Sequence, residues 1–298
     1  MPRLLIPFLL LLISTQASAE ARIPAFILQV PPSVPDIFIA DTSDATLLRF
    51  THEQGVISLA DTSYMSIGQK GAGKKRAWDR RSPLGIYFVV DRLDTSRLHE
   101  KYGVMAFPLD YPNVRDRQLE RTGDGIWVHG VQPGNSRRPA FDTDGCLALP
   151  NENLTALESN FVPLRTPVII AREMRWQDEA TRDRLRDELR AAVNNWFEAY
   201  ASADEDRYFS LYAHDFSYRG LTAGEWRQYR RYGMRQRGKL DAAIDELLLL
   251  ADPEEEGLFL SRFHQVVTDG DNVRTTTRRL YWRRNEAGQL EIIAEDNG

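Results

Sequence analysis

The chain has 298 residues, of which 42% are hydrophobic and 27% are charged, a composition typical of a folded protein of about two domains. Its 38 Lys and Arg against 43 Asp and Glu give a formal net charge of −5, which argues against a nucleic-acid-binding protein. The single cysteine, Cys146, excludes an intramolecular disulfide framework and a multi-cysteine zinc site.

Residues 1–19 have the pattern of a secretory signal peptide. Arg3 supplies a positive start, residues 4–13 are apolar with one proline, and residues 17–19 read Ala-Ser-Ala, a small-residue cleavage site. The apolar run is shorter than the roughly 20 residues that span a bilayer. We therefore expect an exported, periplasmic protein without stable membrane insertion, with an uncleaved membrane anchor as the alternative. Outside the cytoplasm a free thiol is exposed to oxidation, so the cysteine is either buried and inert or chemically needed.

The next segments predict a lead-in and a β-rich domain. Residues 20–35 contain prolines without a periodic pattern and predict a lead-in segment, a tether or a short strand. Residues 36–172 form the first predicted domain, in which short apolar runs alternate with turn-rich stretches. Its predicted strands are 37–40, 47–50, 85–90, 126–129 and 167–171, and a brief helix is predicted at 154–159.

Residues 181–298 form the second predicted domain. Within residues 180–203 apolar side chains recur at steps of three and four, which is typical of an amphipathic helix. Two shorter helices are expected at 204–213 and 223–238, the latter with Thr222 as its N-cap. Four strands are predicted after the helices, at 243–250, 257–268, 272–283 and 290–294. A turn sequence at Asp269-Gly270 separates the second strand from the third, and another at 285–288 separates the third from the fourth. Helices followed by an antiparallel meander predict an α+β domain.

A histidine and the only cysteine lie in two glycine-containing segments of the first domain. His129 precedes Gly130, and Cys146 ends the sequence Thr143-Asp144-Gly145-Cys146. A thiol is a poor nucleophile until it loses its proton, and a nearby imidazole can take that proton and return it to a leaving amine. A glycine before the cysteine allows a tight turn whose amides face an oxyanion, an effect of about 3–4 kcal/mol per donor. The alternative is an inert buried cysteine, and the aspartates on either side of Thr143 favour the protonated thiol.

The sequence around these residues resembles the L,D-transpeptidase (YkuD) family. The family signature is a histidine, a gap of about sixteen residues, then [ST]-x-G-C and a nearby asparagine, which here is Asn151. Residues 67–87 and 101–113 also resemble family motifs, the "K…TPxGxY" sequence and a "YG…FxLxYPN" insert. The resemblance covers about residues 36–172.

This resemblance implies a β-rich catalytic domain that acts on peptidoglycan stem peptides and needs no metal or cofactor. Cys146 would attack the carbonyl at the L-centre of a diamino acid, commonly meso-diaminopimelate, and expel the terminal D-alanine. His129 would act as general base and then general acid, oriented by the carbonyl of Gly130. The amides of Gly145 and Cys146 would form the oxyanion hole. The expected substrate-binding residues are Tyr102, Thr143 and Asn151.

One position departs from the family pattern. Many relatives carry an arginine two residues after the cysteine, where this chain has Ala148, and an arginine is a natural partner for a substrate carboxylate. Its absence resembles the YafK-like and cell-shape branch, some of whose members trim or hydrolyse rather than cross-link. Either Lys101, Arg115 or Arg117 supplies the charge, or these three lie in a solvated loop.

The second domain resembles the cone-shaped nuclear transport factor-like (SnoaL-like) fold. Four of its aromatic residues either bind a glycan or peptide or simply pack the core: Tyr208, Tyr212, Trp226 and Tyr281. A catalytic domain of this kind followed by such a cone resembles the L,D-carboxypeptidases that set cell shape in helical bacteria. The sequence therefore predicts a stem-peptide transpeptidase or carboxypeptidase of the cell wall, and a catalytically inactive wall-binding module is the alternative. The sequence does not determine the oligomeric state, and a monomer and a homodimer are both retained as alternatives.

Overall fold

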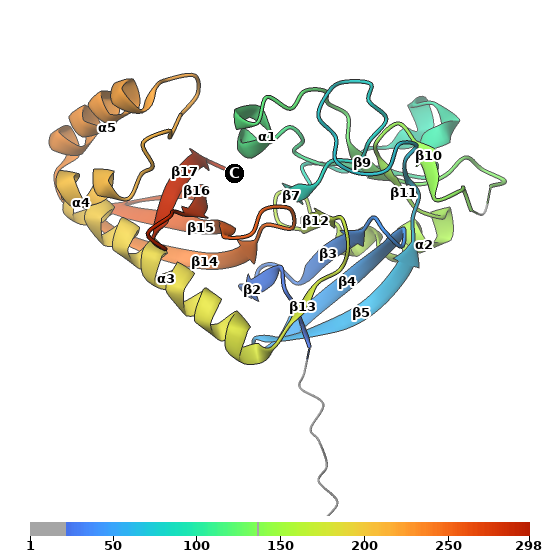
Figure 1. The fold of residues 1–298 in the computed structure, drawn as a ribbon, viewed down its shortest axis with the longest axis horizontal. Helices are drawn as coiled ribbons and strands as arrows, with labels where there is room; N and C mark the ends of the chain where they lie inside the picture. Colours follow the sequence, from blue (N-terminus) through green and yellow to red (C-terminus); the bar gives the residue numbers. More distant parts are fainter. Residues whose placement is uncertain (1–21, 136) are drawn as a thin grey trace, which may run out of the picture.

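The computed structural model describes residues 22–135 and 137–298, and it has the mostly-β catalytic region and the α+β second region that the sequence predicts (Figure 1). The predicted signal peptide at residues 1–19 lies outside the described residues. In the part of the chain that the structure describes, no helix has both the length and the apolar character that a membrane crossing requires.

The first domain is built on a five-stranded mixed sheet with the order β5-β4-β3-β12-β7. Its strands are β3 (Asp36–Asp41), β4 (Thr46–Glu53), β5 (Val56–Tyr64), β7 (Gly85–Phe88) and β12 (Pro167–Ala171). Strands β3 and β12 are parallel, whereas the other neighbours are antiparallel. All residues of β3, β7 and β12 are buried, as expected for strands covered on both faces. The edge strand β5, whose side chains are largely exposed, is not among the predicted strands.

Smaller sheets beside this one carry the residues of the chemical motif. A three-stranded sheet has the order β11-β9-β8, and a two-stranded sheet pairs β6 with β10. Their strands are β6 (Ile67–Gly68), β8 (Ala106–Pro108), β9 (Trp127–His129), β10 (Phe141–Thr143) and β11 (Leu147–Ala148). Strands β9 and β11 are parallel neighbours, with Ala148 opposite His129. This pairing brings the histidine segment and the cysteine segment side by side.

Short helical segments connect the strands of the first domain. They are α1 (Val114–Gln118), α2 (Asn151–Ala156) and the 3-10 turns η1 (Thr95–Arg97), η2 (Glu100–Tyr102) and η3 (Glu158–Asn160). Together α2 and η3 occupy the region of the single helix predicted at 154–159. Helix α1 is not predicted from the sequence; it begins with a capping box between Asn113 and Asp116.

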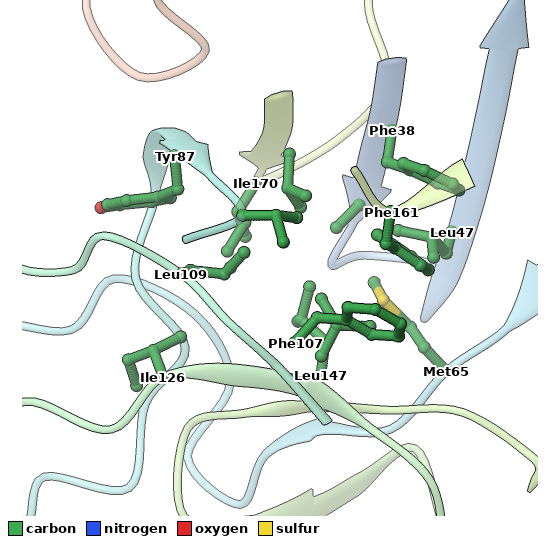
Figure 2. Close-up of a cluster of buried hydrophobic side chains, with 14 of the residues drawn as sticks. Phe38, Leu47, Met65, Tyr87, Phe107, Leu109, Ile126, Leu147, Phe161 and Ile170 are labelled. Carbon is green, nitrogen blue, oxygen red and sulfur yellow. The ribbon is translucent and has the colours of Figure 1, made fainter. Parts of the chain in front are cut away.

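A hydrophobic cluster fills the space between the large sheet and the small sheets (Figure 2). Within it the ring of Phe161 stacks on Phe38, with 4.2 Å between ring centroids, and on Phe107, with 4.7 Å. Ile126 and Leu147, from the histidine segment and the cysteine segment respectively, are buried in the same cluster. Their burial fixes the backbone that carries the chemical motif.

The second domain has the predicted order of helices and then strands. Its elements are α3 (Glu179–Ser202), α4 (Glu205–Ser210), α5 (Ala223–Arg237), β14 (Asp241–Ala251), β15 (Leu258–Asp269), β16 (Asn272–Arg284) and β17 (Leu290–Asp296). Thr222 caps α5 through a capping box with Glu225, which confirms the predicted N-cap. The strands form an antiparallel meander, and α3 packs along β14 and β15 (Figure 1).

The fifth strand of this second sheet comes from the N-terminal segment. Strand β2 (Ile27–Gln29) pairs with β14 and gives the order β17-β16-β15-β14-β2. Just before it, β1 (Ile23–Pro24) pairs with β13 (Trp176–Gln177), which lies between the two domains. The described part of the predicted lead-in segment therefore completes the sheet of the second domain.

The two domains share one hydrophobic cluster and several ion pairs. The cluster combines β3, β7 and β12 of the first domain with β14 to β17 of the second. A buried arginine, Arg279 of β16, contacts Asp110 of the first domain and lies 2.5 Å from Asp296. Further out, Arg121 of the first domain lies 2.6 Å from Glu254 of the second. Apolar burial and charge pairing therefore act together where the two domains meet.

The aromatic residues singled out in the second domain are core residues in this structure. Tyr208, Tyr212, Trp226 and Tyr281 are all buried, as the packing alternative predicts. The Tyr208 and Tyr212 hydroxyl groups lie 2.8 Å apart, and Tyr212 donates to Glu295 at 2.8 Å. The hydroxyl groups of Tyr208 and Tyr212 are therefore satisfied inside the domain. The buried hydroxyl of Tyr281 has no hydrogen-bond partner among the described residues.

Candidate active site

A pocket of about 280 Å³ lies where η2, the loop before β9 and the connection from β10 to β11 meet. Both His129 and Cys146 line it, together with Tyr102 and Thr143. These elements lie on the side of the catalytic domain away from α4 and α5 (Figure 1). The fold thus gathers in one pocket four side chains that the sequence analysis singled out.

The imidazole of His129 is held in one tautomer by its own backbone. Its Nδ1 lies 2.6 Å from the carbonyl oxygen of Gly130, and because a carbonyl only accepts, Nδ1 carries the proton. The side chain is 3% exposed, and this burial lowers the pKa of His129 to about 4 although the bond to Gly130 opposes the change. At neutral pH the ring is therefore uncharged, and Nε2 is the nitrogen that can accept a proton.

The thiol of Cys146 is protonated in the resting site. Its Sγ lies 3.3 Å from the carbonyl oxygen of Gly125, to which it donates. Burial raises the pKa of Cys146 to about 11. Cys146 and His129 are thus a neutral thiol and a neutral imidazole at rest, and a neutral thiol is a poor nucleophile until a base removes its proton.

Each aspartate beside Thr143 has a cationic neighbour. Asp142 lies 2.8 Å from Nε of Arg138, and Asp144 lies 3.7 Å from Nζ of Lys101. These pairs reduce the negative potential that the two carboxylates would otherwise impose on the thiol.

Thr143 organises the turn before the cysteine. Its Oγ1 donates to the carbonyl of Cys146 at 2.8 Å and accepts from the amide of Gly145 at 3.1 Å. Gly145 has φ +130°, and a Cβ there would lie 2.7 Å from the carbonyl oxygen of Arg81, so only glycine fits. In this structure the Gly145 amide, one of the two expected oxyanion donors, is engaged within the turn.

Asn151 lies behind the histidine segment and is not among the described residues that line the pocket. Its Oδ1 accepts from the amides of Val131 at 3.0 Å and Val104 at 3.4 Å, and its Nδ2 donates to the carbonyl of Val131 at 2.7 Å. A Cβ on Gly130 would lie 2.2 Å from Oδ1, which explains the glycine after the histidine. The structure thus places Asn151 against the backbone of the histidine segment and outside the pocket lining, and its role toward the substrate stays a prediction.

The three cations considered in place of an arginine at Ala148 lie in different surroundings. Lys101 lines the pocket. Arg115 instead pairs at 2.6 Å with Glu255 of the second domain, and Arg117 donates to the carbonyl of Pro112. Ala148 itself is buried in β11. Of these three cations, Lys101 alone is positioned to meet a group in the pocket.

Two pocket residues, Arg138 and Trp78, are missed by the sequence analysis. Arg138 lies in a loop and matches no motif, and it also lines an adjoining hollow with Lys101 and Arg137. Trp78 is 92% exposed at the pocket. A lone tryptophan among the charged residues of 74–81 is the signal that points to it.

Comparison with known proteins identifies both domains. Residues 35–170 match the family model of the YkuD L,D-transpeptidase catalytic domain. Residues 188–296 match that of the Cds6 C-terminal NTF2-like domain. The chain carries a YkuD L,D-transpeptidase catalytic domain followed by an NTF2-like domain. This confirms the family resemblance and the fold class expected for both parts.

Two solved structures share this fold over almost their whole length. Bd1075 from Bdellovibrio bacteriovorus is 21% identical, with a TM-score of 0.77, over 93% of this chain and 98% of that one. The helical cell shape determining protein Pgp2 from Campylobacter jejuni is 22% identical, with a TM-score of 0.77, over 92% of this chain and 95% of that one. No match was found among the curated proteins.

Proposed function

We propose that this protein is an exported, periplasmic enzyme of the cell wall that cleaves peptidoglycan stem peptides through a Cys146 thioester. The observation that carries the proposal is that a thiol and an imidazole with its proton on Nδ1 line the same pocket of a YkuD domain. Pgp2, whose name records a role in helical cell shape, has the same two-domain fold and is consistent with a cell-wall role.

The proposed acylation step moves one proton and exchanges one bond. Nε2 of His129 takes the Sγ proton while Sγ attacks the carbonyl carbon at the L-centre of the diamino acid. The tetrahedral intermediate collapses, the C–N bond breaks, and His129 returns the proton to the departing D-alanine amine. In the second step water or an amine attacks the thioester, gives its proton to His129, and Cys146 leaves and is reprotonated.

The oxyanion of each tetrahedral intermediate needs donors at the turn before the cysteine. We assign this role to the backbone amide of Cys146. The backbone amide of Gly145 would be a second donor once it gives up its hydrogen bond to Oγ1 of Thr143. The carbonyl of Gly130 keeps the imidazole in the required tautomer throughout.

Substrate carboxylates would meet the cationic side of the pocket. Lys101 and Arg138 take the place of the arginine that many relatives carry at the position of Ala148. The ring of Tyr102 contacts the His129 ring edge-on, with 5.2 Å between centroids, and would form the wall against which the substrate lies. Thr143 acts through the turn, and Asn151 through the histidine segment.

The acyl acceptor separates a carboxypeptidase from a transpeptidase. Ala148 and the NTF2-like domain favour water, because both are features of the carboxypeptidase branch that the sequence resembles. Mass spectrometry of tetrapeptide muropeptides incubated with the enzyme decides between them. Tripeptide alone indicates hydrolysis and crosslinked dimer indicates transfer, whereas unchanged tetrapeptide would refute the proposed substrate.

A catalytically inactive wall-binding module is the second candidate, favoured by the raised pKa of the cysteine thiol. Labelling of Cys146 by a carbapenem separates the two, because acylation by a β-lactam ring requires an activated nucleophile. A thiol that stays unmodified while His129 is intact would favour the inactive module.

A further inference from the structure

The loop of residues 74–81, next to the cysteine, is organised around one carboxylate. Asp79 accepts hydrogen bonds from the amides of Lys75 at 2.7 Å, Arg76 at 3.0 Å and Arg81 at 3.1 Å. It also accepts one from Nζ of the buried Lys74 at 2.9 Å. Partial burial acts to raise the pKa of Asp79, but these donors outweigh it and lower the pKa to about 2. The carboxylate is therefore charged at any physiological pH and holds the loop in one shape.

The same loop is braced against the segment that leads to β9. The amide of Ala77 donates to Oγ1 of Thr122 at 3.2 Å, and the amide of Thr122 donates to the carbonyl of Lys75 at 3.1 Å. The hydroxyl of Tyr111 in turn donates to the carbonyl of Thr122 at 3.1 Å. The loop is thus tied to the part of the chain that ends in the catalytic histidine.

This rigid loop displays a large apolar side chain to solvent. Trp78 is 92% exposed, and it has a left-handed φ of +62°, with Arg80 at +58° two residues later. Such angles are unfavourable for residues with a side chain, and they persist where surrounding contacts impose them, often at functional sites. The loop thus holds an uncovered indole in one place at the edge of the pocket.

We propose that the exposed face of Trp78 is a platform for a sugar ring of the glycan strand that carries the stem peptide. The inference rests on the proposed function, and it adds a glycan subsite to the catalytic pocket, which Trp78 lines together with Cys146. An aromatic face held in place before binding loses little conformational freedom when a ligand stacks on it.

The chemistry of the substrate favours the sugar over the peptide at this position. Around the scissile bond the stem peptide presents mainly carboxylates, an amine and amide groups, which match Lys101, Arg138 and the backbone of the pocket. The flat C–H face of a pyranose ring is the part of the molecule that matches an indole. In the stem peptide two residues separate the sugar from the diamino acid, an extended length of at least about 7 Å, so the sugar lies outside the catalytic centre when the carbonyl meets Cys146.

The test measures binding of the tripeptide product, which has no scissile bond, either free or attached to its disaccharide. Calorimetry with Trp78→Ala is expected to show binding of the disaccharide-tripeptide weakened about tenfold, and binding of the free tripeptide weakened less than about twofold. Trp78→Phe keeps an aromatic face and is expected to retain most of the affinity for the disaccharide ligand. Tyr229→Ala removes an exposed ring of α5 outside the pocket, and its binding of both ligands should match the wild type.

Equal weakening of both ligands by Trp78→Ala would overturn the proposal, because the indole would then contact the peptide. Unchanged binding of both would overturn it as well, and so would a wild-type protein that binds the two ligands equally. These results are independent of catalysis. Failure of the wild-type enzyme to turn over free tetrapeptide would instead count against the proposed function.

Discussion

The Nδ1 atom of His129 lies 2.6 Å from the carbonyl oxygen of the adjacent Gly130, and this contact decides which nitrogen is the base. Because Nδ1 carries the proton and donates it in a hydrogen bond to this carbonyl, Nε2 is unprotonated and keeps its lone pair. Burial keeps the ring neutral by lowering the pKa of His129 to about 4. Cys146 and His129 are therefore both neutral at rest and form no thiolate–imidazolium pair, and in the proposed mechanism the thiol is activated only as it reacts.

The activity should persist to unusually low pH. The base form of His129 is needed, and it exists above a pKa of about 4, compared with 6.5 for a free imidazole. We expect kcat/KM for a tetrapeptide to be level between pH 5 and pH 7 and to fall with a midpoint near pH 4. A pH profile between 3 and 8 measures this, and an acid limb centred above pH 6 would contradict the buried, neutral histidine.

Removing either reacting group should abolish turnover and leave the fold intact. We expect Cys146→Ala and His129→Ala each to lower kcat by about 1,000-fold or more, and the double variant to lose little beyond that, because the two act as a unit. Product formation is followed by mass spectrometry, and circular dichroism with thermal unfolding serves as the control for folding. A single variant that keeps more than about a tenth of the activity would remove that residue from the mechanism.

Asn151→Ala should slow the reaction through the position of the histidine. The change leaves the amide and carbonyl of Val131 without partners, which costs about 1–3 kcal/mol of unfolding free energy. We expect a lower kcat with a nearly unchanged KM. Asn153→Ala is the matched control, because Asn153 lies on the same helix and bonds to Ser63 instead. A selective rise in KM for Asn151→Ala would favour direct substrate contact.

Arg138→Gln should weaken substrate binding more than it slows chemistry. Loss of a charge-assisted bond to a carboxylate is expected to raise KM about tenfold or more, with kcat changed little. Arg92→Gln removes an arginine that pairs with Glu158 outside the pocket, so it should leave both constants unchanged. Steady-state kinetics with tetrapeptide distinguishes these outcomes, and an unaltered KM for Arg138→Gln would remove Arg138 from carboxylate recognition.

Arg279→Ala should be strongly destabilising because it uncouples the domains. The partly buried carboxylates of Asp110 and Asp296 would lose the buried cation that they share, at a cost of about 3–5 kcal/mol. Arg278→Ala, one residue away, removes contacts with Gln265 and Asn297 and should cost less than about 1 kcal/mol. Urea unfolding measures both, and equal losses for the two variants would show that the buried pair has no special role.

The sequence predicted the elements and residues whose signals are local. The helices of the second domain, the Thr222 cap and the two turns follow from periodicity and turn chemistry, and they are confirmed. His129 and Cys146 are singled out by the sequence because their spacing resembles a family motif, and the structure places both in one pocket, while their catalytic roles stay a prediction. The contacts of Asn151 with the histidine segment were not apparent, because they depend on the close approach of Gly130, a three-dimensional contact.

Features that depend on distant parts of the chain were missed. Strand β5 has largely exposed side chains and lacks the alternation of a half-buried strand, so its existence follows only from its pairing with β4. Arg138 enters the pocket through a loop whose path no periodic pattern describes. The contribution of β2 to the second sheet joins segments from opposite ends of the chain.

That last feature makes the order of synthesis matter for the second domain. Residues 27–29 leave the ribosome early, but their partner β14 is made only after the whole catalytic domain. A fragment that begins after residue 172 would expose the edge of β14 and the apolar surface that Phe26 and Ile27 cover. Strand β2 can therefore pair only after β14 has been synthesised, and a product that stops before residue 241 leaves β2 without this partner.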